Sequence, residues 1–137
     1  MSRDEDRLAR VALIEFRGVK KAFGTKQVYR GLDLDMNEGE SLTIIGGSGQ
    51  GKSVMLKMLI GLLGIDEGEI RFDGEVISGA SEAQFAKVRR NIGMLFQGAA
   101  LFDSLSVKDN VAYGLREQFQ MTEAEIDERV EESLTYV

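Results

Sequence analysis

Residues 46–53, which read Gly-Gly-Ser-Gly-Gln-Gly-Lys-Ser, constrain this chain more than any other feature. They fit the pattern G-x-x-x-x-G-K-[ST] at every fixed position. The residues before them, 41–45, predict a short buried strand, and the residues after them, 54–63, predict an apolar helix. A strand, a glycine-rich turn and a helix in this order form a cradle for the phosphates of a nucleotide, so the sequence predicts a phosphate-binding loop.

The residue types in this loop suit that chemistry. Glycines have no Cβ, so backbone N–H groups can approach phosphate oxygens, and the helix start adds N–H groups and a positive dipole end. We expect Lys52 to reach the β- and γ-phosphates, and the Ser53 hydroxyl to ligate Mg²⁺. The predicted nucleotide-binding residues of the loop are Gly46, Gly47, Ser48, Gly49, Gln50, Gly51, Lys52 and Ser53. The alternative is a glycine-rich turn that only caps a core helix.

The composition excludes several other classes of protein. The chain has 137 residues, enough for one domain with a modest core, and its net charge of −6 argues against a nucleic-acid binder. Cysteine is absent, which excludes disulfides and thiolate metal sites, and histidine, the commonest general base, is absent too. No apolar run reaches the length of a membrane span, and the charged start does not resemble a signal peptide.

The order of the predicted elements indicates an α/β fold. Residues 1–10 are expected to form a charged extension, followed by a small antiparallel β-subdomain around residues 11–40. In its second strand, at 28–36, apolar residues alternate with aspartates. Further strands are predicted at 68–73 and 92–96, and a short helix begins at Ser81 and runs to about Arg90.

Two later helices carry N-terminal capping signals, one at Ser106 and one at Thr122. The last helix places Ile126, Val130, Leu134 and Val137 on one apolar stripe, opposite a strongly acidic face that we interpret as solvated. No glycine stop signal precedes the end of the sequence, so we expect the chain to end inside an element.

Several motifs together resemble the nucleotide-binding subunit of ATP-binding cassette (ABC) transporters, over roughly residues 11–137. They are Lys-Ala-Phe-Gly at 21–24, the phosphate-binding loop, Gly-Glu-Ile-Arg-Phe-Asp-Gly at 68–74 and Met-Leu-Phe-Gln at 94–97. Residues 96–117 look like the subgroup that powers phospholipid trafficking in the bacterial envelope, the lipid-asymmetry and Mce-associated systems. The resemblance implies part of a P-loop NTPase core with an N-terminal antiparallel β-subdomain, and ATP and Mg²⁺ as cofactors.

The resemblance also implies individual roles. Phe23 matches the aromatic residue that stacks on adenine, and Gln97 matches the glutamine that contacts Mg²⁺ and the attacking water. Leu101, Phe102 and Leu105 would line a groove that receives a helix of the membrane subunit. The structural alternatives are a strand-end core residue for Phe23, a polar strand end for Gln97 and core packing for the other three. Gly47 stands where the family usually has proline, which leaves the backbone donors unaffected.

Three features of the family do not occur in this sequence: a Leu-Ser-Gly-Gly-Gln signature, an apolar strand ending in Asp-Glu, and a switch histidine. We therefore expect an N-terminal half of a nucleotide-binding domain that binds nucleotide and hydrolyses little of it. The implied partners are permease subunits, contacted through residues 97–105, and a second copy in the intact protein, at the cytoplasmic side of the inner membrane. The piece itself is expected to self-associate, possibly by domain swapping. A small-molecule kinase and a non-catalytic nucleotide-binding module are the alternatives.

Overall fold

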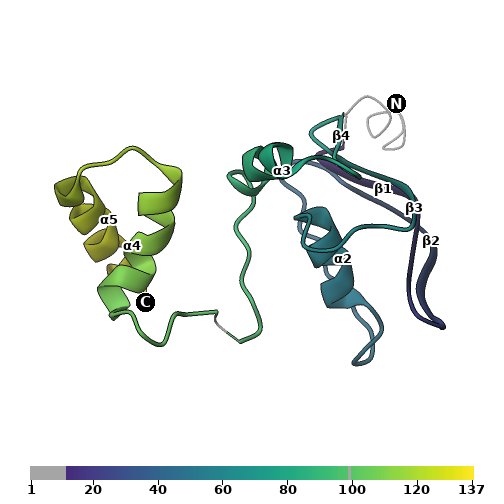
Figure 1. Cartoon of the computed structure of the whole chain (residues 1–137), viewed down its shortest axis with the longest axis horizontal. Coiled ribbons are helices and arrows are strands. Elements are labelled where there is room, and N and C mark those ends of the chain that lie inside the picture. Colours follow the sequence, from purple (N-terminus) through teal and green to yellow (C-terminus); the bar gives the residue numbers. More distant parts are fainter. Residues whose placement is uncertain (1–11, 99) are drawn as a thin grey trace, which may run out of the picture. The chain divides into compact units, whose positions relative to one another are not determined.

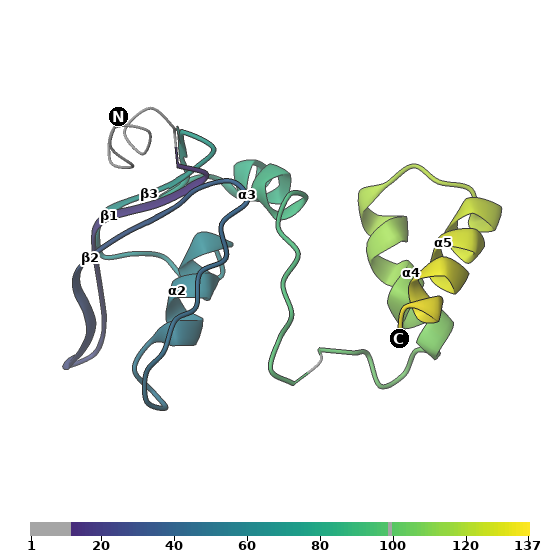
Figure 2. The same ribbon diagram turned by 180° about the vertical axis from the view of Figure 1, so that it is seen from behind.

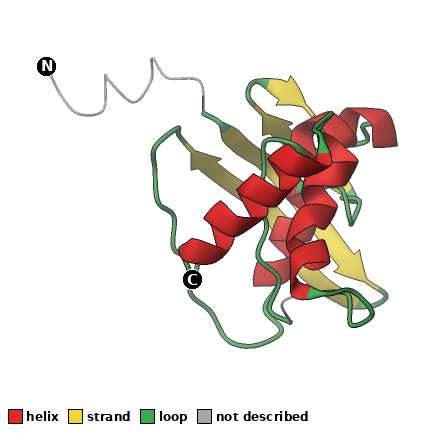
Figure 3. Cartoon of the chain, turned by 90° about the vertical axis from the view of Figure 1, so that its left-hand side faces the viewer, coloured by secondary structure: helices red, strands yellow, loops and turns green. Residues whose placement is uncertain are grey.

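The computed structural model describes residues 12–98 and 100–137, and the chain divides into two units, the first ending at Ile92 and the second beginning at Gly93 (Figure 1). Each unit is considered by itself below. The predicted charged extension at 1–10 lies outside the described residues. Within the described residues every strand belongs to the first unit, and the second contains only helices and loops. Figure 3 shows the helices in red and the strands in yellow.

An antiparallel sheet forms one layer of the first unit. Among the described residues its strand order is β2-β1-β3-β4. The register pairs Ile14 with Met36 across β1 and β2, and Ile14 with Phe72 across β1 and β3. The predicted N-terminal β-subdomain is therefore confirmed, and a later hairpin extends it. The strands are β1 (Ile14–Phe23), β2 (Lys26–Met36), β3 (Glu67–Phe72) and β4 (Glu75–Val76).

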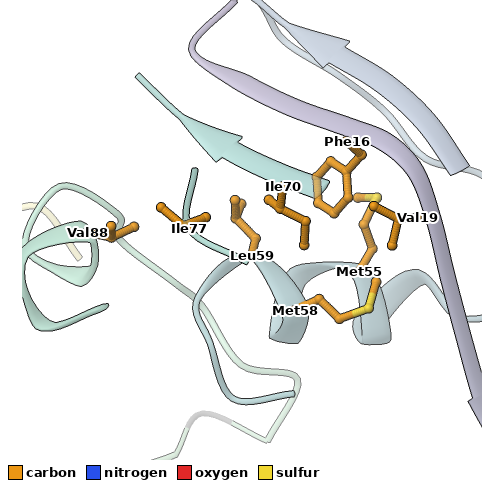
Figure 4. Close-up of a cluster of buried hydrophobic side chains, with 8 residues drawn as sticks. All are labelled: Phe16, Val19, Met55, Met58, Leu59, Ile70, Ile77 and Val88. Atoms are coloured by element: carbon orange, nitrogen blue, oxygen red, sulfur yellow. The ribbon is translucent and has the colours of Figure 1, made fainter. Parts of the chain in front are cut away.

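Helix α2 (Lys52–Leu59) lies along one face of this sheet (Figures 1 and 2). The helix contributes Met55, Met58 and Leu59 to the core, which they share with sheet residues and with Val88 of α3 (Glu82–Arg89) (Figure 4). The opposite side of this core consists of Phe16, Val19 and Ile70 from the strands and Ile77 directly after β4. Burial of this apolar surface fixes the start of α2, and with it the phosphate-binding loop, relative to β1 and β2.

Local signals account for the ends of these helices. Ser81 caps α3 with a complete capping box, as its position predicts. Helix α2 ends at Leu59 rather than at the predicted residue 63, because Gly61 adopts a left-handed conformation with φ 72°. The Leu62 N–H then donates to the Lys57 carbonyl at 2.8 Å, which is a common way to end a helix at glycine.

Two strand predictions are wrong. Residues 41–45 and 92–96 have no strand structure, although both segments are apolar and of suitable length. A strand is stabilised by hydrogen bonds to a neighbouring strand, and neither segment pairs with any described strand. Their apolar side chains are instead partly or largely in solvent, and Ile45 and Leu95 are 90% and 91% exposed.

The second unit is a pair of helices, α4 (Val107–Gln118) and α5 (Glu123–Thr135), packed through Ala112, Ile126 and Val130. The predicted caps are present: Ser106 accepts a hydrogen bond from the Asp109 N–H, and Thr122 forms a capping box with Glu125. The predicted apolar stripe is only half right, because Leu134 and Val137 are exposed. No helix in the described ranges is long and apolar enough to cross a membrane.

Candidate phosphate-binding site

The phosphate-binding loop lies between the end of β2 and the start of α2, and its glycines adopt conformations that other residues avoid. Gly49 has φ 74° and Gly51 has φ 101°, both in the left-handed region. Gly51 is the N-cap residue of α2 and has no side chain with which to cap it. The first turn of the helix therefore presents backbone N–H groups rather than a side-chain cap.

Unpaired donors are the main property of this loop. Within the described ranges, none of the backbone N–H groups of residues 48–53 has a hydrogen-bond acceptor in the chain. They follow one another along a glycine-rich turn and into the positive end of the α2 dipole. Such a row of donors favours an anion with several oxygen atoms, as a phosphate group has.

Lys52 supplies a positive charge from within the loop. Its ammonium group donates to the Gly46 and Gly47 carbonyl oxygens, each at 2.7 Å. An ammonium group has three N–H donors, so one of them remains for a phosphate oxygen. The Gly47 N–H is held at 3.1 Å from Gln50 Oε1, which closes the loop across its first residues.

Ser53 follows Lys52 on the first turn of α2 and is exposed. Its hydroxyl makes no hydrogen bond to any other described residue. A hydroxyl oxygen is a suitable ligand for Mg²⁺, which usually takes its remaining ligands from phosphates and water. The donor set of this loop thus fits a nucleotide phosphate together with Mg²⁺.

Phe23 ends β1 and is 45% exposed, so the alternative that it is an ordinary core residue is wrong. Its partner across the hairpin is Lys26, whose ammonium group lies 3.2 Å from the Gly49 carbonyl oxygen. The Lys26 contact therefore brings the hairpin end that carries the aromatic ring to the phosphate-binding loop. The Lys21 ammonium group lies 5.5 Å from the centroid of the Phe23 ring.

Asp66 holds this end of β1 in place. Its carboxylate accepts hydrogen bonds from the Lys21 ammonium group at 2.8 Å and from the Ala22 N–H at 2.6 Å. These two bonds lower the pKa of the Asp66 carboxyl, with the Lys21 bond as the larger cause. Asp66 therefore remains a carboxylate at neutral pH and fixes the backbone next to Phe23.

Two further contributors could not be found from the sequence. Lys26 reaches Gly49, and the Tyr29 hydroxyl donates to the Gly51 carbonyl at 2.8 Å. Both contacts join residues more than twenty positions apart in the chain. No local pattern in the sequence signals them.

Gln97 lies in the second unit, exposed, in a segment without regular structure. Its role beside Lys52 therefore stays a prediction. Leu101, Phe102 and Leu105 belong to the same unit, and all three are exposed, so within that unit they do not form a core. The Phe102 ring packs against Tyr113 of α4 with ring centroids 4.7 Å apart.

Asn110 shapes this exposed apolar segment. Its side-chain oxygen accepts the Phe102 N–H at 2.8 Å, and its NH₂ group lies within 3.2 Å of the carbonyl oxygens of Phe102, Leu105 and Ser106. The segment from Phe102 to Ser106 is thus held against the start of α4, while the side chains of Phe102 and Leu105 are exposed.

Comparison with known proteins shows which family the chain matches. A family model described as ABC transporter matches residues 29–137. The chain is 44% identical over 126 residues to "Protein TRIGALACTOSYLDIACYLGLYCEROL 3, chloroplastic" of Arabidopsis thaliana, covering 91% of this chain and 36% of that protein. It is 42% identical over 124 residues to "Probable ribonucleotide transport ATP-binding protein mkl" of Mycobacterium leprae, covering 90% of this chain and 36% of that protein.

Solved structures resemble the chain as well. The dimeric structure of MJ0796, a bacterial ABC transporter cassette, matches with a TM-score of 0.82 at 29% identity, over 89% of this chain and 56% of that one. cbiO1 from Clostridium perfringens, part of the ABC transporter complex cbiONQ, matches with a TM-score of 0.75 at 29% identity, over 90% of this chain and 49% of that one. These matches confirm the fold class. The chain spans about a third of the length of the curated relatives and about half of these solved cassettes.

Proposed function

Because this chain belongs to the ABC transporter family, we propose that it carries the phosphate-binding part of an ATP-binding transporter subunit. The observation that carries the proposal is the row of backbone N–H groups at residues 48–53, without acceptors among the described residues, beside the Lys52 ammonium group. One of the solved relatives, MJ0796, is bound to ADP and phosphate in a post-hydrolysis state. Residues 11–137 then correspond to the N-terminal half of a nucleotide-binding domain.

Each residue would have a separate task when ATP–Mg²⁺ is bound. The loop N–H groups and the third Lys52 donor would hold phosphate oxygens, and the Ser53 hydroxyl would be a protein ligand to Mg²⁺. Phe23 would stack on the adenine ring, and Gln97 would orient the attacking water. The bound metal would spread the negative charge of the phosphates.

Binding without steady hydrolysis is the result that this proposal expects for the chain itself. Phosphoryl transfer depends on positioned groups around the γ-phosphate, and the sequence contains neither the signature string nor a histidine. Isothermal titration with ATP–Mg²⁺ tests the binding, and a phosphate-release assay tests the absence of steady hydrolysis. Steady turnover that depends on Lys52 would show that the chain is a complete enzyme of another kind, such as a small-molecule kinase.

Phospholipid is the cargo that we propose for the whole transporter. Two features support it: residues 96–117 resemble the lipid-trafficking subgroup, and one relative carries the name of a galactolipid. The mycobacterial relative is named for ribonucleotide transport. Reconstituting the full-length protein with its membrane subunits in vesicles and measuring ATP-driven movement of each cargo would distinguish the two.

The partners that we propose are permease subunits, which would dock on the exposed apolar residues within 97–105, and a second copy of the full-length protein. This assembly would place the protein at the cytoplasmic face of the inner membrane. Leu101 is 66% exposed, which leaves it accessible to such a contact. A cross-link from position 101 to a permease subunit would support the docking site, and its absence in an active complex would exclude it.

Ser53→Ala is expected to weaken ATP binding only when Mg²⁺ is present, because Ser53 acts through the metal. The loss of one metal ligand predicts a several-fold weaker affinity in Mg²⁺ and little change in excess chelator. Ser48→Ala is the matched control, since Ser48 lies in the same loop and contributes its backbone N–H. An effect of Ser53→Ala that persists unchanged in chelator would show that Ser53 is not a metal ligand.

Self-association of the chain is expected as well. Residues 41–45 expose apolar side chains and unpaired backbone groups, and such segments recruit other chains. Exchange of an element between copies is one route, and the exposed Leu134 adds apolar surface in the second unit. Light scattering over a concentration series should show dimers or larger species. A monomer that persists at high concentration and unfolds cooperatively would contradict this expectation.

A further inference from the structure

Tyr29 connects the sheet to the phosphate-binding loop. It lies on β2 opposite Lys21 of β1, and its ring packs against the core of the first unit. The side chain is half-buried, and its hydroxyl donates to the Gly51 carbonyl oxygen at 2.8 Å. Burial raises the pKa of the Tyr29 phenol, and the Met55 N–H lowers it by a smaller amount. The hydroxyl therefore keeps its proton, and so remains a donor, throughout the neutral range.

The acceptor of this hydrogen bond, the Gly51 carbonyl, lies at the start of α2. Gly51 caps α2, and its carbonyl also accepts the N–H groups of Val54 at 2.7 Å and Met55 at 3.1 Å. All three donors lie on the side of α2 and β2. They fix the direction in which the Gly51 carbonyl points.

The direction of that carbonyl determines the direction of the next N–H group. The C=O of Gly51 and the N–H of Lys52 belong to one planar trans peptide and point in opposite directions. With the carbonyl held toward the α2 N–H groups and the Tyr29 hydroxyl, the Lys52 N–H points the opposite way, out of the start of the helix. It is one of the loop N–H groups without an acceptor among the described residues.

The fit at this point is close. A Cβ atom added to Gly51 would lie 2.5 Å from Val28 Cγ1 and 3.1 Å from the Tyr29 hydroxyl oxygen. Residues of β2 therefore lie directly against the Gly51 backbone. The Tyr29 hydroxyl is held there by the packing of its ring, so its position does not depend on a flexible side chain.

We propose that Tyr29 is a positioning residue for the phosphate site, whose hydroxyl orients the Gly51–Lys52 peptide so that the Lys52 N–H points at a bound phosphate group. This inference rests on the proposed function, because it deepens the description of the same site. Tyr29 touches no phosphate itself and acts only through the peptide.

Tyr29→Phe tests the inference, because it removes the hydroxyl and keeps the ring. We expect ADP–Mg²⁺ to bind about three- to tenfold more weakly in isothermal titration, the range of one neutral hydrogen bond. Tyr113→Phe is the matched control, since the Tyr113 hydroxyl has no hydrogen-bond partner within the described residues, and its affinity should equal that of the unmodified chain.

A second measurement distinguishes a positioning role of Tyr29 from a general loss of loop structure in the variant. In ¹⁵N–¹H spectra the Lys52 amide resonance should move downfield when ADP–Mg²⁺ binds, and this displacement should shrink in Tyr29→Phe. The Ser48 amide, at the other end of the loop, should respond equally in both proteins. If the Tyr29→Phe loss were purely structural, both displacements would shrink together, which would overturn the inference.

The outcomes distinguish the inference from the proposed function. Equal affinity and equal Lys52 displacement in the unmodified chain and Tyr29→Phe would overturn the inference and leave ATP binding intact. Failure of the unmodified chain to bind ADP–Mg²⁺ at any concentration would overturn both.

Discussion

Lys52→Ala is expected to weaken ATP–Mg²⁺ binding about 10- to 100-fold, the range of a hydrogen bond to a charged group in a site of this kind. The Lys52 ammonium group lies at the loop carbonyls with one donor remaining for phosphate, so its removal eliminates the only side-chain charge within the loop itself. Isothermal titration measures the change directly. The fold should survive, since the Gly46 and Gly47 carbonyls that lose a donor lie in exposed residues and can bind water.

The matched control is Lys57→Ala, which removes an exposed lysine from the last turn of the same helix. It should bind ATP–Mg²⁺ as the unmodified chain does. Phe23→Ala is the informative comparison. It removes a single stacking contact with the adenine ring, so it should weaken ATP–Mg²⁺ binding less than Lys52→Ala does. A larger loss for Phe23→Ala, or equal losses for the two lysine variants, would contradict the assignment of Lys52.

Gly51→Ala is expected to destabilise the first unit by about 1–3 kcal/mol, because alanine rarely adopts φ 101° and its Cβ would lie 2.5 Å from Val28 Cγ1. The same change should abolish measurable ATP binding, because the loop must distort to accept the methyl group. Denaturant unfolding measures the stability and titration the affinity.

Gly64→Ala is the control for this change. Gly64 has no positive φ, and a Cβ there would meet nothing within 4 Å. It should leave both stability and affinity unchanged. If Gly51→Ala behaved in the same way, the left-handed conformation at the start of α2 would not be required for the site.

Local patterns made the core of this site and several helix ends predictable. The phosphate-binding loop, the helix that follows it and the capping residues Ser81 and Thr122 depend on a few neighbouring residues, and the structure has them where the sequence places them. The β1–β2 hairpin was equally predictable, because its apolar residues alternate along β2. The exposure of Phe23 follows from its position at the end of that hairpin.

What the sequence could not provide depends on distant partners. The contacts of Lys26 with Gly49 and of Tyr29 with Gly51 arise only when β2 passes beside the loop. The pairing of β3 with β1 likewise joins segments about fifty residues apart. At residues 41–45 and 92–96 the sequence predicted too much. Apolar composition alone predicted strands there, but neither segment has a hydrogen-bonded neighbouring strand among the described residues.

The most direct test of the central claim is to titrate the chain with ATP–Mg²⁺ and follow its backbone amides by ¹⁵N–¹H spectroscopy. The account predicts saturable shifts that are largest at the N–H groups of residues 48–53, and in Lys52→Ala these shifts should need about 10- to 100-fold more ATP–Mg²⁺. Helices α4 and α5 serve as the internal reference in the same spectra. No saturable shift, or shifts centred outside the loop and the Phe23 hairpin, would contradict the claim that this loop binds nucleotide phosphate.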